Sequence, residues 1–315
     1  MAATRIETLA FKHQVRNYIN GAVVQSISGD AAFLAPRVPM GSLVNTVWKF
    51  DRLRPFRIPS TKRASGGKAT VVDFGGSTED ISLQLNALDT GIETQNQTDD
   101  EVVMGLQSQV NQVTSLAGLS HLAETVATVQ AAMTAASVTT TLDISNDDPV
   151  AIIDALCKTI LLSCGDASSM MKIRFLWGWN AAAKVLADPD IIARISGGAT
   201  ESQPAKPTLE TLKRLFLFPN TEHRLSTAIK DTGEQGSATE ARAFVLDDEV
   251  LIVAASDNPT VSDPSAFKSF WKGSAGMDTR YYKRDDGRVE MFGLDWAYKV
   301  YAANASASRR VTVQA

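Results

Sequence analysis

The fold of this 315-residue chain is organised around residues 44–85, which read VNTVWKFDRLRPFRIPSTKRASGGKATVVDFGGSTEDISLQL. Both flanks are rich in apolar residues, and Ile81, Leu83 and Leu85 recur at the period of two that is typical of a strand. Residues 59–67 between the flanks are turn formers and charged residues with nothing apolar to bury. The stretch therefore predicts a long two-stranded ribbon that closes at a polar tip.

The ribbon is also strongly basic. Residues 49–68 carry seven basic side chains against the single acidic side chain of Asp51, although the chain as a whole has a formal net charge of −4. The seven are Lys49, Arg52, Arg54, Arg57, Lys62, Arg63 and Lys68. A two-stranded ribbon alone in water is marginally stable. We therefore expect this one to complete its folding against another molecule.

Composition limits the class of protein. Hydrophobic residues make up 44% and charged residues 21% of the chain, which is enough for one large or two modest folded domains. An acidic chain does not coat nucleic acid with its whole surface, so any such contact is local. There is no apolar run of 18 residues and no apolar signal core before Asp30, so we expect neither a membrane span nor secretion. Cys157 and Cys164 lie two helical turns apart and are predicted to be reduced core residues.

A long helix is predicted after the ribbon. Thr98 and Glu101 form a capping-box pattern, and apolar residues then recur at steps of three and four as far as Met133. Glu124 is the only charged residue between positions 102 and 142. A helix of about 35 residues is about 50 Å long, and so few charges predict that it packs on several faces, some of them against other subunits.

The remainder of the chain reads as mixed helix and strand. A helix is predicted to begin at Asp148 and Pro149, and a buried strand at residues 171–176. Residues 244–246 and 250–253 are predicted to pair across the acidic turn at 247–249. A second hairpin, residues 279–282 with 288–300, turns at the Asp-Gly pair of positions 286 and 287.

Residues that would carry chemistry are sparse. His13, His121 and His223 lie far apart, and the spacings of common metal, phosphate-binding and hydrolase motifs are absent from the sequence. Cys164 has no histidine beside it in sequence that would make it a nucleophile. We therefore predict no enzyme activity, no catalytic residue, no cofactor and no metal.

The order of these parts resembles a known family. An LAPRVP segment (34–39) leads to a strand with Trp48 and Phe50, the basic ribbon and a return strand into LQLNALDTGI (83–92). The low-charge helix, the Ala-Asp-Pro stop at 187–189 and a PSAF segment at 264–267 follow. In this order and spacing, across nearly the whole chain, the sequence resembles the major capsid protein of tailed bacteriophages.

The resemblance implies an α+β fold of the tailed-phage (Hong Kong 97-type) major capsid class, with an N-terminal arm, an extended loop (E-loop), a long spine helix in a peripheral domain, and an axial domain. Carried over to this chain, residues 1–43 are the N-terminal arm and the segment leading into the ribbon, and 44–85 the E-loop ribbon. Residues 86–147 hold the spine helix of the peripheral domain, 148–278 are the axial domain, and 279–315 are the C-terminal strands of the peripheral domain.

The function implied by the resemblance is structural. Many copies would assemble as pentamers and hexamers into an icosahedral shell around packaged double-stranded DNA, with the E-loop lying over a neighbouring subunit. The ribbon residues expected at that interface are Phe50, Arg52, Leu53, Arg54, Phe56, Arg57, Lys62, Arg63 and Lys68. Their candidate acidic partners on the neighbour are Asp99, Asp100, Glu101, Asp247, Asp248 and Glu249. Exposed ion pairs contribute at most about 1 kcal/mol each, so these pairs would set register more than strength.

The same resemblance implies that the protein is made in the bacterial host cytoplasm and resides in the virion. DNA would be held by nonspecific contact, portal, scaffold and decoration proteins are the further partners of such shells, and no membrane is involved. Two alternatives stay open. One is an encapsulin-like compartment that loads an enzyme cargo; the other is a small oligomeric nucleic-acid-binding protein that uses the basic ribbon on DNA. In some relatives an E-loop lysine is crosslinked to a neighbour's asparagine. Lys62 and Lys68 are placed for that here, but the reaction also needs an asparagine and a catalytic carboxylate across subunits, which the sequence does not show, so we do not expect a crosslink.

Overall fold

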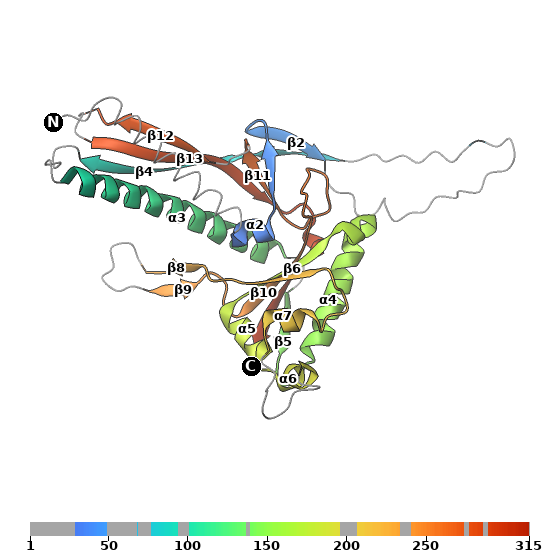
Figure 1. Ribbon diagram of the computed structural model, residues 1–315. Helices are drawn as coiled ribbons and strands as arrows, with labels where there is room; N and C mark the ends of the chain where they lie inside the picture. Colours follow the sequence, from blue (N-terminus) through green and yellow to red (C-terminus); the bar gives the residue numbers. More distant parts are fainter. Residues whose placement is uncertain are drawn as a thin grey trace.

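The computed structural model describes residues 29–48, 68, 77–93, 101–136, 139–195, 207–233, 241–273, 277–285 and 289–314. These residues form two five-stranded sheets and two separate two-stranded ribbons (Figure 1). The mixed α+β character predicted from the sequence is confirmed.

The first sheet, here called the β13 sheet, is built around the longest described strand. Its order is β1 (Arg37–Met40), β11 (Lys268–Lys272), β13 (Val289–Tyr301) and β12 (Met277–Lys283), and β4 (Gln84–Glu93) also pairs with β13. The β12–β13 pair is antiparallel, with Lys283 opposite Glu290 next to the turn, as the Asp-Gly signal predicts. Phe292, Leu294 and Trp296 alternate along β13 and pack on one face against Leu116 and Ala117 of the long helix.

The second sheet, here called the β10 sheet, has the order β5 (Thr139–Asp143), β14 (Ser308–Gln314), β10 (Glu249–Ala255), β6 (Lys172–Trp177) and β7 (Thr221–Leu225). Every residue of β10 from Val250 to Ala255 is buried, so both faces of the sheet are covered. The predicted buried strand at 171–176 is β6, at the heart of the main hydrophobic core.

The long helix is α3 (Glu101–Ala135), a single helix that passes through Gly118 and lies along the β13 sheet (Figure 1). The predicted helix and its C-terminal end are confirmed; Thr98, Asp99 and Asp100 lie outside the described residues. The short helix α2 (Asp30–Leu34) packs against both α3 and β6 and so lies where the two sheets meet.

The other helices surround the β10 sheet, and α4 and α7 begin at side-chain caps. They are α4 (Pro149–Cys164), α5 (Trp179–Leu186), α6 (Pro189–Ile195) and α7 (Leu209–Lys213), with short 3₁₀ turns η3 (Gly165–Met170) and η4 (Ala305–Ala307). Asp148 accepts from the backbone N–H groups of Val150 and Ala151, and proline occupies the first turn of α4. Both cysteines are buried and unpaired on α4, as predicted.

Two antiparallel ribbons belong to neither five-stranded sheet. One pairs β2 (Val44–Trp48) with β3 (Thr78–Ser82), and the other pairs β8 (Ile229–Asp231) with β9 (Arg242–Phe244). The first is the base of the ribbon predicted at 44–85; the second was not anticipated.

The hairpin predicted across the turn at 247–249 is wrong. β9 pairs with β8, whereas β10 pairs with β6 on one side and β14 on the other. The physical reason is burial: a strand that is apolar on both faces gains most in the middle of a covered sheet. Gly178 makes room for the turn, because a Cβ on it would meet the Asp247 carbonyl oxygen at 2.1 Å.

The strands are also divided between the two sheets differently from the way in which the sequence divides the chain into segments. β14, which was assigned with the C-terminal strands of residues 279–315, pairs with β10 and β5. β11 lies within residues 148–278 but joins the β13 sheet. Pairing between distant strands depends on which sheet edge is available, and a local sequence pattern does not carry that information. The domain boundaries themselves stay a prediction.

Candidate subunit interface

The base of the predicted E-loop ribbon is rigidly attached to the body. β2 and β3 run antiparallel in the register Val44 to Ser82 and Trp48 to Thr78. Val47 and Ile81 face inward and pack with Phe270 and Ala297 of the β13 sheet. The described base of the ribbon is therefore held against the β13 sheet (Figure 1).

Polar contacts lock the same base. The Tyr301 hydroxyl donates to a Glu79 carboxylate oxygen at 2.8 Å, and Thr46 donates to Asp80 at 2.5 Å. Burial, together with the Glu79 carboxylate, raises the pKa of Tyr301 to about 12, so its proton stays in place at neutral pH. Val44 at the start of β2 and Leu85 on β4 are exposed.

The ribbon residues predicted at the interface fall mostly beyond the described part of the chain. Phe50, Arg52, Leu53, Arg54, Phe56, Arg57, Lys62 and Arg63 lie outside the described residues. Lys68 is described and is exposed. Their roles stay a prediction.

The acidic turn at 247–249 already makes contacts within its own chain. Asp247 accepts from the backbone and side-chain nitrogens of Asn180 at 3.2 and 3.0 Å, at the start of α5. Asp248 pairs with Lys184 at 3.0 Å, and Glu249 pairs with Arg310. The turn thus fixes α5 and β14. Of the other candidate partners, Glu101 begins α3, whereas Asp99 and Asp100 lie outside the described residues.

Glu124, the only charged residue of α3 after Glu101, forms a buried joint between α3 and the β13 sheet. Its side chain is 2% exposed, and one carboxylate oxygen accepts from the Arg37 guanidinium at 2.7 Å. That guanidinium also stacks on the Trp271 ring, 4.1 Å from its centroid. Burial raises the pKa of Glu124 in spite of the arginine. The sequence shows that this charge is isolated, but it does not show which residue pairs with it.

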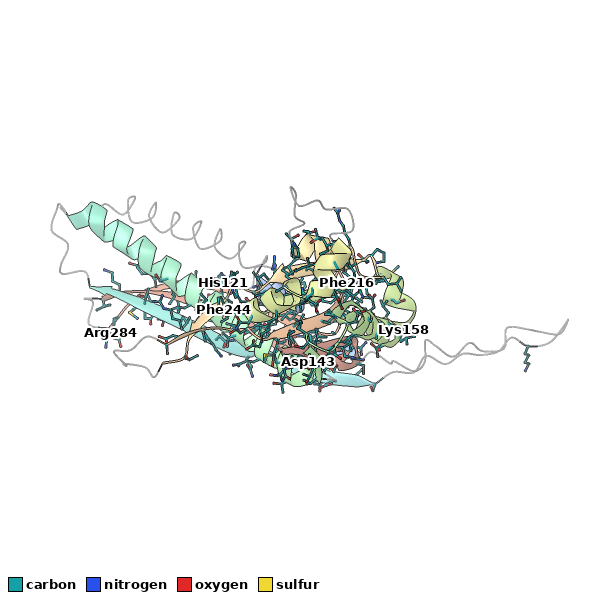
Figure 2. All side chains as sticks on the ribbon, turned by 90° about the horizontal axis from the view of Figure 1, so that it is seen from below. His121, Asp143, Lys158, Phe216, Phe244 and Arg284 are labelled. Atoms are coloured by element: carbon teal, nitrogen blue, oxygen red, sulfur yellow. The ribbon has the colours of Figure 1, made fainter. Side chains whose placement is uncertain are left out.

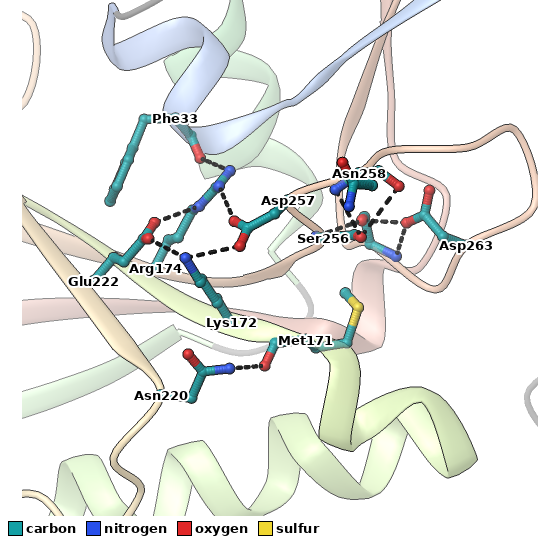
Figure 3. A network of polar contacts seen from close by, with 11 residues as sticks. Phe33, Met171, Lys172, Arg174, Asn220, Glu222, Ser256, Asp257, Asn258 and Asp263 are labelled. Atoms are coloured by element: carbon teal, nitrogen blue, oxygen red, sulfur yellow. Dashed lines mark hydrogen bonds and ion pairs between the residues drawn. The ribbon is translucent and has the colours of Figure 1, made fainter.

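A second polar network ties α2 to the β10 sheet (Figure 3). Arg174 donates to the Phe33 carbonyl oxygen and pairs with Glu222 and Asp257, and Lys172 pairs with the same two carboxylates. Burial acts to raise the pKa of Glu222, but the two cations outweigh it and lower that pKa. Two cations and two carboxylates of the β10 sheet and the loop after β10 therefore balance one another, and Arg174 links this group to α2 through the Phe33 carbonyl oxygen.

An aromatic pair between the start of α5 and the ribbon β8–β9 was not predicted from the sequence. Trp179, the first residue of α5, stacks on Phe244 with ring centroids 5.6 Å apart. Ile229 lies directly opposite Phe244 in the ladder, and both Ile229 and Trp179 remain about half exposed. The signal available in the sequence was the run of aromatic residues near Trp179, which reads equally well as core.

The described ranges contain neither a metal-binding cluster nor a membrane-spanning helix. No three histidine, cysteine or acidic side chains gather there in a way that could hold a metal ion. No helix formed by the described residues is long and apolar enough to cross a membrane.

No protein-family model and no curated protein matches the sequence. Solved structures do match. A phage-related protein from Bordetella bronchiseptica superposes with a TM-score of 0.67 at 18% identity, covering 93% of this chain and 95% of that one. A virus-like particle from Pyrococcus furiosus gives 0.53 at 11% identity over 95% and 98%, and the mature capsid of bacteriophage PhiM1 gives 0.52 at 11% over 91% and 87%.

At these identities the likeness concerns the fold. It extends over nearly the full length of each chain. The resemblance inferred from the order of parts in the sequence is confirmed at the level of fold. The chain has the fold of the major capsid proteins of tailed bacteriophages.

Proposed function

We propose that this protein is a shell-forming major capsid protein, in which many copies assemble as pentamers and hexamers into an icosahedral particle that encloses double-stranded DNA. The observation that carries the proposal is the ribbon β2–β3, held firmly at its base and joined to neither five-stranded sheet. A ribbon of this kind gains its missing stability by lying on a neighbour. The mature capsid of bacteriophage PhiM1 is built from a protein of the same fold, which supports assembly of this chain into a shell.

The apolar part of the ribbon supplies the strength of this contact. Phe50, Leu53, Phe56 and Ile58 would bury apolar surface on the neighbour at about 25 cal/mol per Å². Val44 and Leu85, exposed at the ribbon base, extend the same surface toward the body.

The basic part sets the register. Arg52, Arg54, Arg57, Lys62, Arg63 and Lys68 would face carboxylates of the neighbour. Since Asp247, Asp248 and Glu249 already hold α5 and β14, we expect Asp99, Asp100 and Glu101 to make the larger contribution. Asp248 is 51% exposed and can still receive a second cation.

The first experiment asks whether shells form and what they contain. The purified protein is examined by electron microscopy and light scattering, and particles are treated with nuclease before their absorbance is compared at 260 and 280 nm. Closed particles with protected DNA support the proposal. A solution of monomers or small oligomers contradicts it, and small oligomers that bind DNA would favour a nucleic-acid-binding protein instead.

The second experiment tests the ribbon. Reversing Arg54 and Arg57 to glutamate should leave a folded subunit that forms few or no shells, because like charges would then face each other. Replacing the same two residues by lysine keeps the charge and should preserve assembly. If the glutamate variant forms normal shells, the charge of the ribbon does not set the register between subunits.

One observation favours a second candidate. The virus-like particle from Pyrococcus furiosus shares this fold along 95% of the chain and is named for a cellular organism. An encapsulin-like compartment would give particles that lack nucleic acid and contain a second protein. Mass spectrometry of purified particles separates that outcome from a DNA-filled shell.

A further inference from the structure

Two short segments of the chain pass from one five-stranded sheet to the other. Residues 256–267, here called the first crossover, lead from β10 into β11, and residues 302–307, the second crossover, lead from β13 back into β14. The strands that they join are neighbours within each sheet, because β11 pairs with β13 and β10 pairs with β14. A contact between the two crossovers therefore acts on the angle between the sheets.

Asn304 ties the second crossover to the first. Its backbone N–H donates to the Ala266 carbonyl oxygen at 3.2 Å, and its side-chain nitrogen donates to the carbonyl oxygens of Ser163 and Pro264 at 3.1 and 3.4 Å. Asn304 is buried, and the hydroxyl of Ser163, near the end of α4, donates in return to the Ser306 carbonyl oxygen at 3.0 Å. One side chain thus joins both crossovers to a helix that packs on β10.

Lys268, the first residue of β11, holds the first crossover from the side of the β13 sheet. Its side chain is 1% exposed, and its ammonium group donates to the carbonyl oxygens of Val261 and Asp263 at 2.9 and 2.7 Å. The Asp263 carboxylate lies 3.3 Å from the same nitrogen. An ammonium group has three donors, and three oxygens surround this one. Because a buried cation is stable only when it is paired and hydrogen-bonded, the crossover keeps its shape around Lys268.

The first crossover is also fixed from the side of the β10 sheet. The backbone N–H of Ser256, next to the end of β10, donates to the Ser265 hydroxyl at 3.1 Å. Ser265 in turn donates through its backbone N–H, at 2.8 Å, and through its hydroxyl to the Asp263 carboxylate, which meets Lys268 (Figure 3 labels Ser256 and Asp263). Polar contacts therefore run without a break from the end of β10 to the start of β11.

We propose that Asn304 and Lys268 form a clasp that fixes the angle between the β10 sheet and the β13 sheet in the free subunit. Removing either side chain leaves buried oxygen atoms without a hydrogen-bond donor, which destabilises the closed joint relative to an opened one. The clasp acts before any shell forms and so goes beyond the proposed function. In a subunit that builds shells, it would give every copy the same shape on assembly.

The test measures the angle between the sheets as a distance. Spin labels are attached at Leu119→Cys on α3, which packs there on the β13 sheet, and at Lys158→Cys on α4, which packs on β10; both positions are exposed. Figure 2 labels Lys158 on α4 and His121, two residues beyond Leu119 on α3. The native Cys157 and Cys164 are buried, and burial raises the pKa of each thiol to about 12, so they are not labelled.

The unassembled subunit with both labels should give one narrow distance by pulsed electron paramagnetic resonance. A broad distribution, or two distances, would mean that the sheets already change their angle in the intact subunit, and would overturn the clasp. This reading depends on no variant of the clasp itself.

Asn304→Ala in the labelled chain should broaden the distance distribution, because the bonds to Ser163 and Pro264 are lost. Asn220→Ala is the matched control. The Asn220 side chain also donates to a backbone carbonyl oxygen, that of Met171 at 2.9 Å, but both residues lie beside the β10 sheet and outside the crossovers. The control should keep the narrow distance, and equal widths in the two variants would contradict the proposal.

Lys268→Met gives a second reading. It leaves the Asp263 carboxylate without its cation and should broaden the distribution more than Asn304→Ala does. Lys184→Met is the control, because Lys184 pairs with Asp248 at 3.0 Å away from both crossovers. Circular dichroism checks that each variant is folded. If Lys268→Met does not fold, the distances in the wild type and in Asn304→Ala still decide.

Particle diameter connects the clasp to assembly. Asn304→Ala should give particles of mixed diameter in electron micrographs, whereas Asn220→Ala should give particles as uniform as those of the wild type. Uniform particles from Asn304→Ala would contradict a role of the clasp in assembly. If the wild type forms no particles, the proposed shell fails, and the distance measurement on the subunit still decides whether the clasp exists.

Discussion

The β10 sheet and the β13 sheet have five strands each but are stabilised differently. β10 is buried along both faces and is enclosed by helices, and its neighbours Phe175, Trp177 and Phe216 form a stack of aromatic rings. The β13 sheet buries one face on α3, whereas Asp89, Arg280 and Tyr282 cover the other face with a polar network in water.

This contrast indicates which part of the subunit is complete on its own. A sheet covered on both faces gains its stability from its own chain. The β13 sheet has α3 on one face, and on the other face the ribbon base covers only the part around Phe270 and Ala297, so this sheet depends on a few anchoring contacts, of which the buried pair of Arg37 and Glu124 is one. Four sets of substitutions test the contrast, and the changes that should cost most stability come first.

Phe175→Ala should cost about 3–5 kcal/mol in the free energy of unfolding, because the ring is fully buried and stacks on His223 at 4.4 Å. Phe292→Ala in the β13 sheet should lower the free energy of unfolding by about 3 kcal/mol, the lower end of that range, because its hydrophobic cluster is small and next to solvent. Urea unfolding of the unassembled subunit measures both. Equal losses would mean that the two sheets are equally self-sufficient.

Arg37→Met should cost about 3 kcal/mol at neutral pH, because it leaves the Glu124 carboxylate buried without its cation. The pKa of Glu124 is already raised by burial and should rise further. A carboxyl whose pKa is higher in the folded state binds more protons when folded, so stability should recover as the pH falls. In the double variant Arg37→Met with Glu124→Gln most of the loss should disappear, and a persistent loss would point to packing on Trp271 instead.

The third test concerns the acid sensitivity of the β10 sheet. The Trp177 indole N–H donates to His223 Nδ1 at 3.1 Å, and burial lowers the pKa of His223 to about 4. Between about pH 6.5 and 4 the unfolded chain binds the proton and the folded chain does not, so stability should decline as the pH falls through that window. His223→Phe should be less stable at neutral pH but should lose this pH dependence. An unchanged slope of unfolding free energy against pH would exclude His223 as its source.

Arg280→Ala should have the smallest effect on the free energy of unfolding, although it removes a guanidinium nitrogen that donates to both Asp89 carboxylate oxygens at 2.9 and 3.0 Å. The pair lies on the wet face of the β13 sheet, where water and salt screen it. Thermal unfolding in low and high salt checks the expectation. A loss as large as that of Arg37→Met would show that the open face is as important as the covered one.

Local patterns predicted the elements that depend on neighbours in sequence. The period of two and the Asp-Gly turn indicated the β12–β13 hairpin, the three- and four-residue steps indicated α3, and Asp148 with Pro149 marked the start of α4. The ribbon base at 44–48 and 78–82 was likewise expected. Most of the predicted interface residues of that ribbon lie outside the described residues, so they stay a prediction.

The pairing of distant segments emerged only in the folded molecule. The order of residues was enough to specify a basic ribbon, a nearly uncharged long helix and an α+β chain whose succession of parts matches capsid proteins. It was not enough to specify that β14 joins β10, that Glu124 meets Arg37, or that β8–β9 stands apart from both sheets. Periodicity reports which face of an element is apolar, whereas the surface that covers this face is chosen by the whole folded chain.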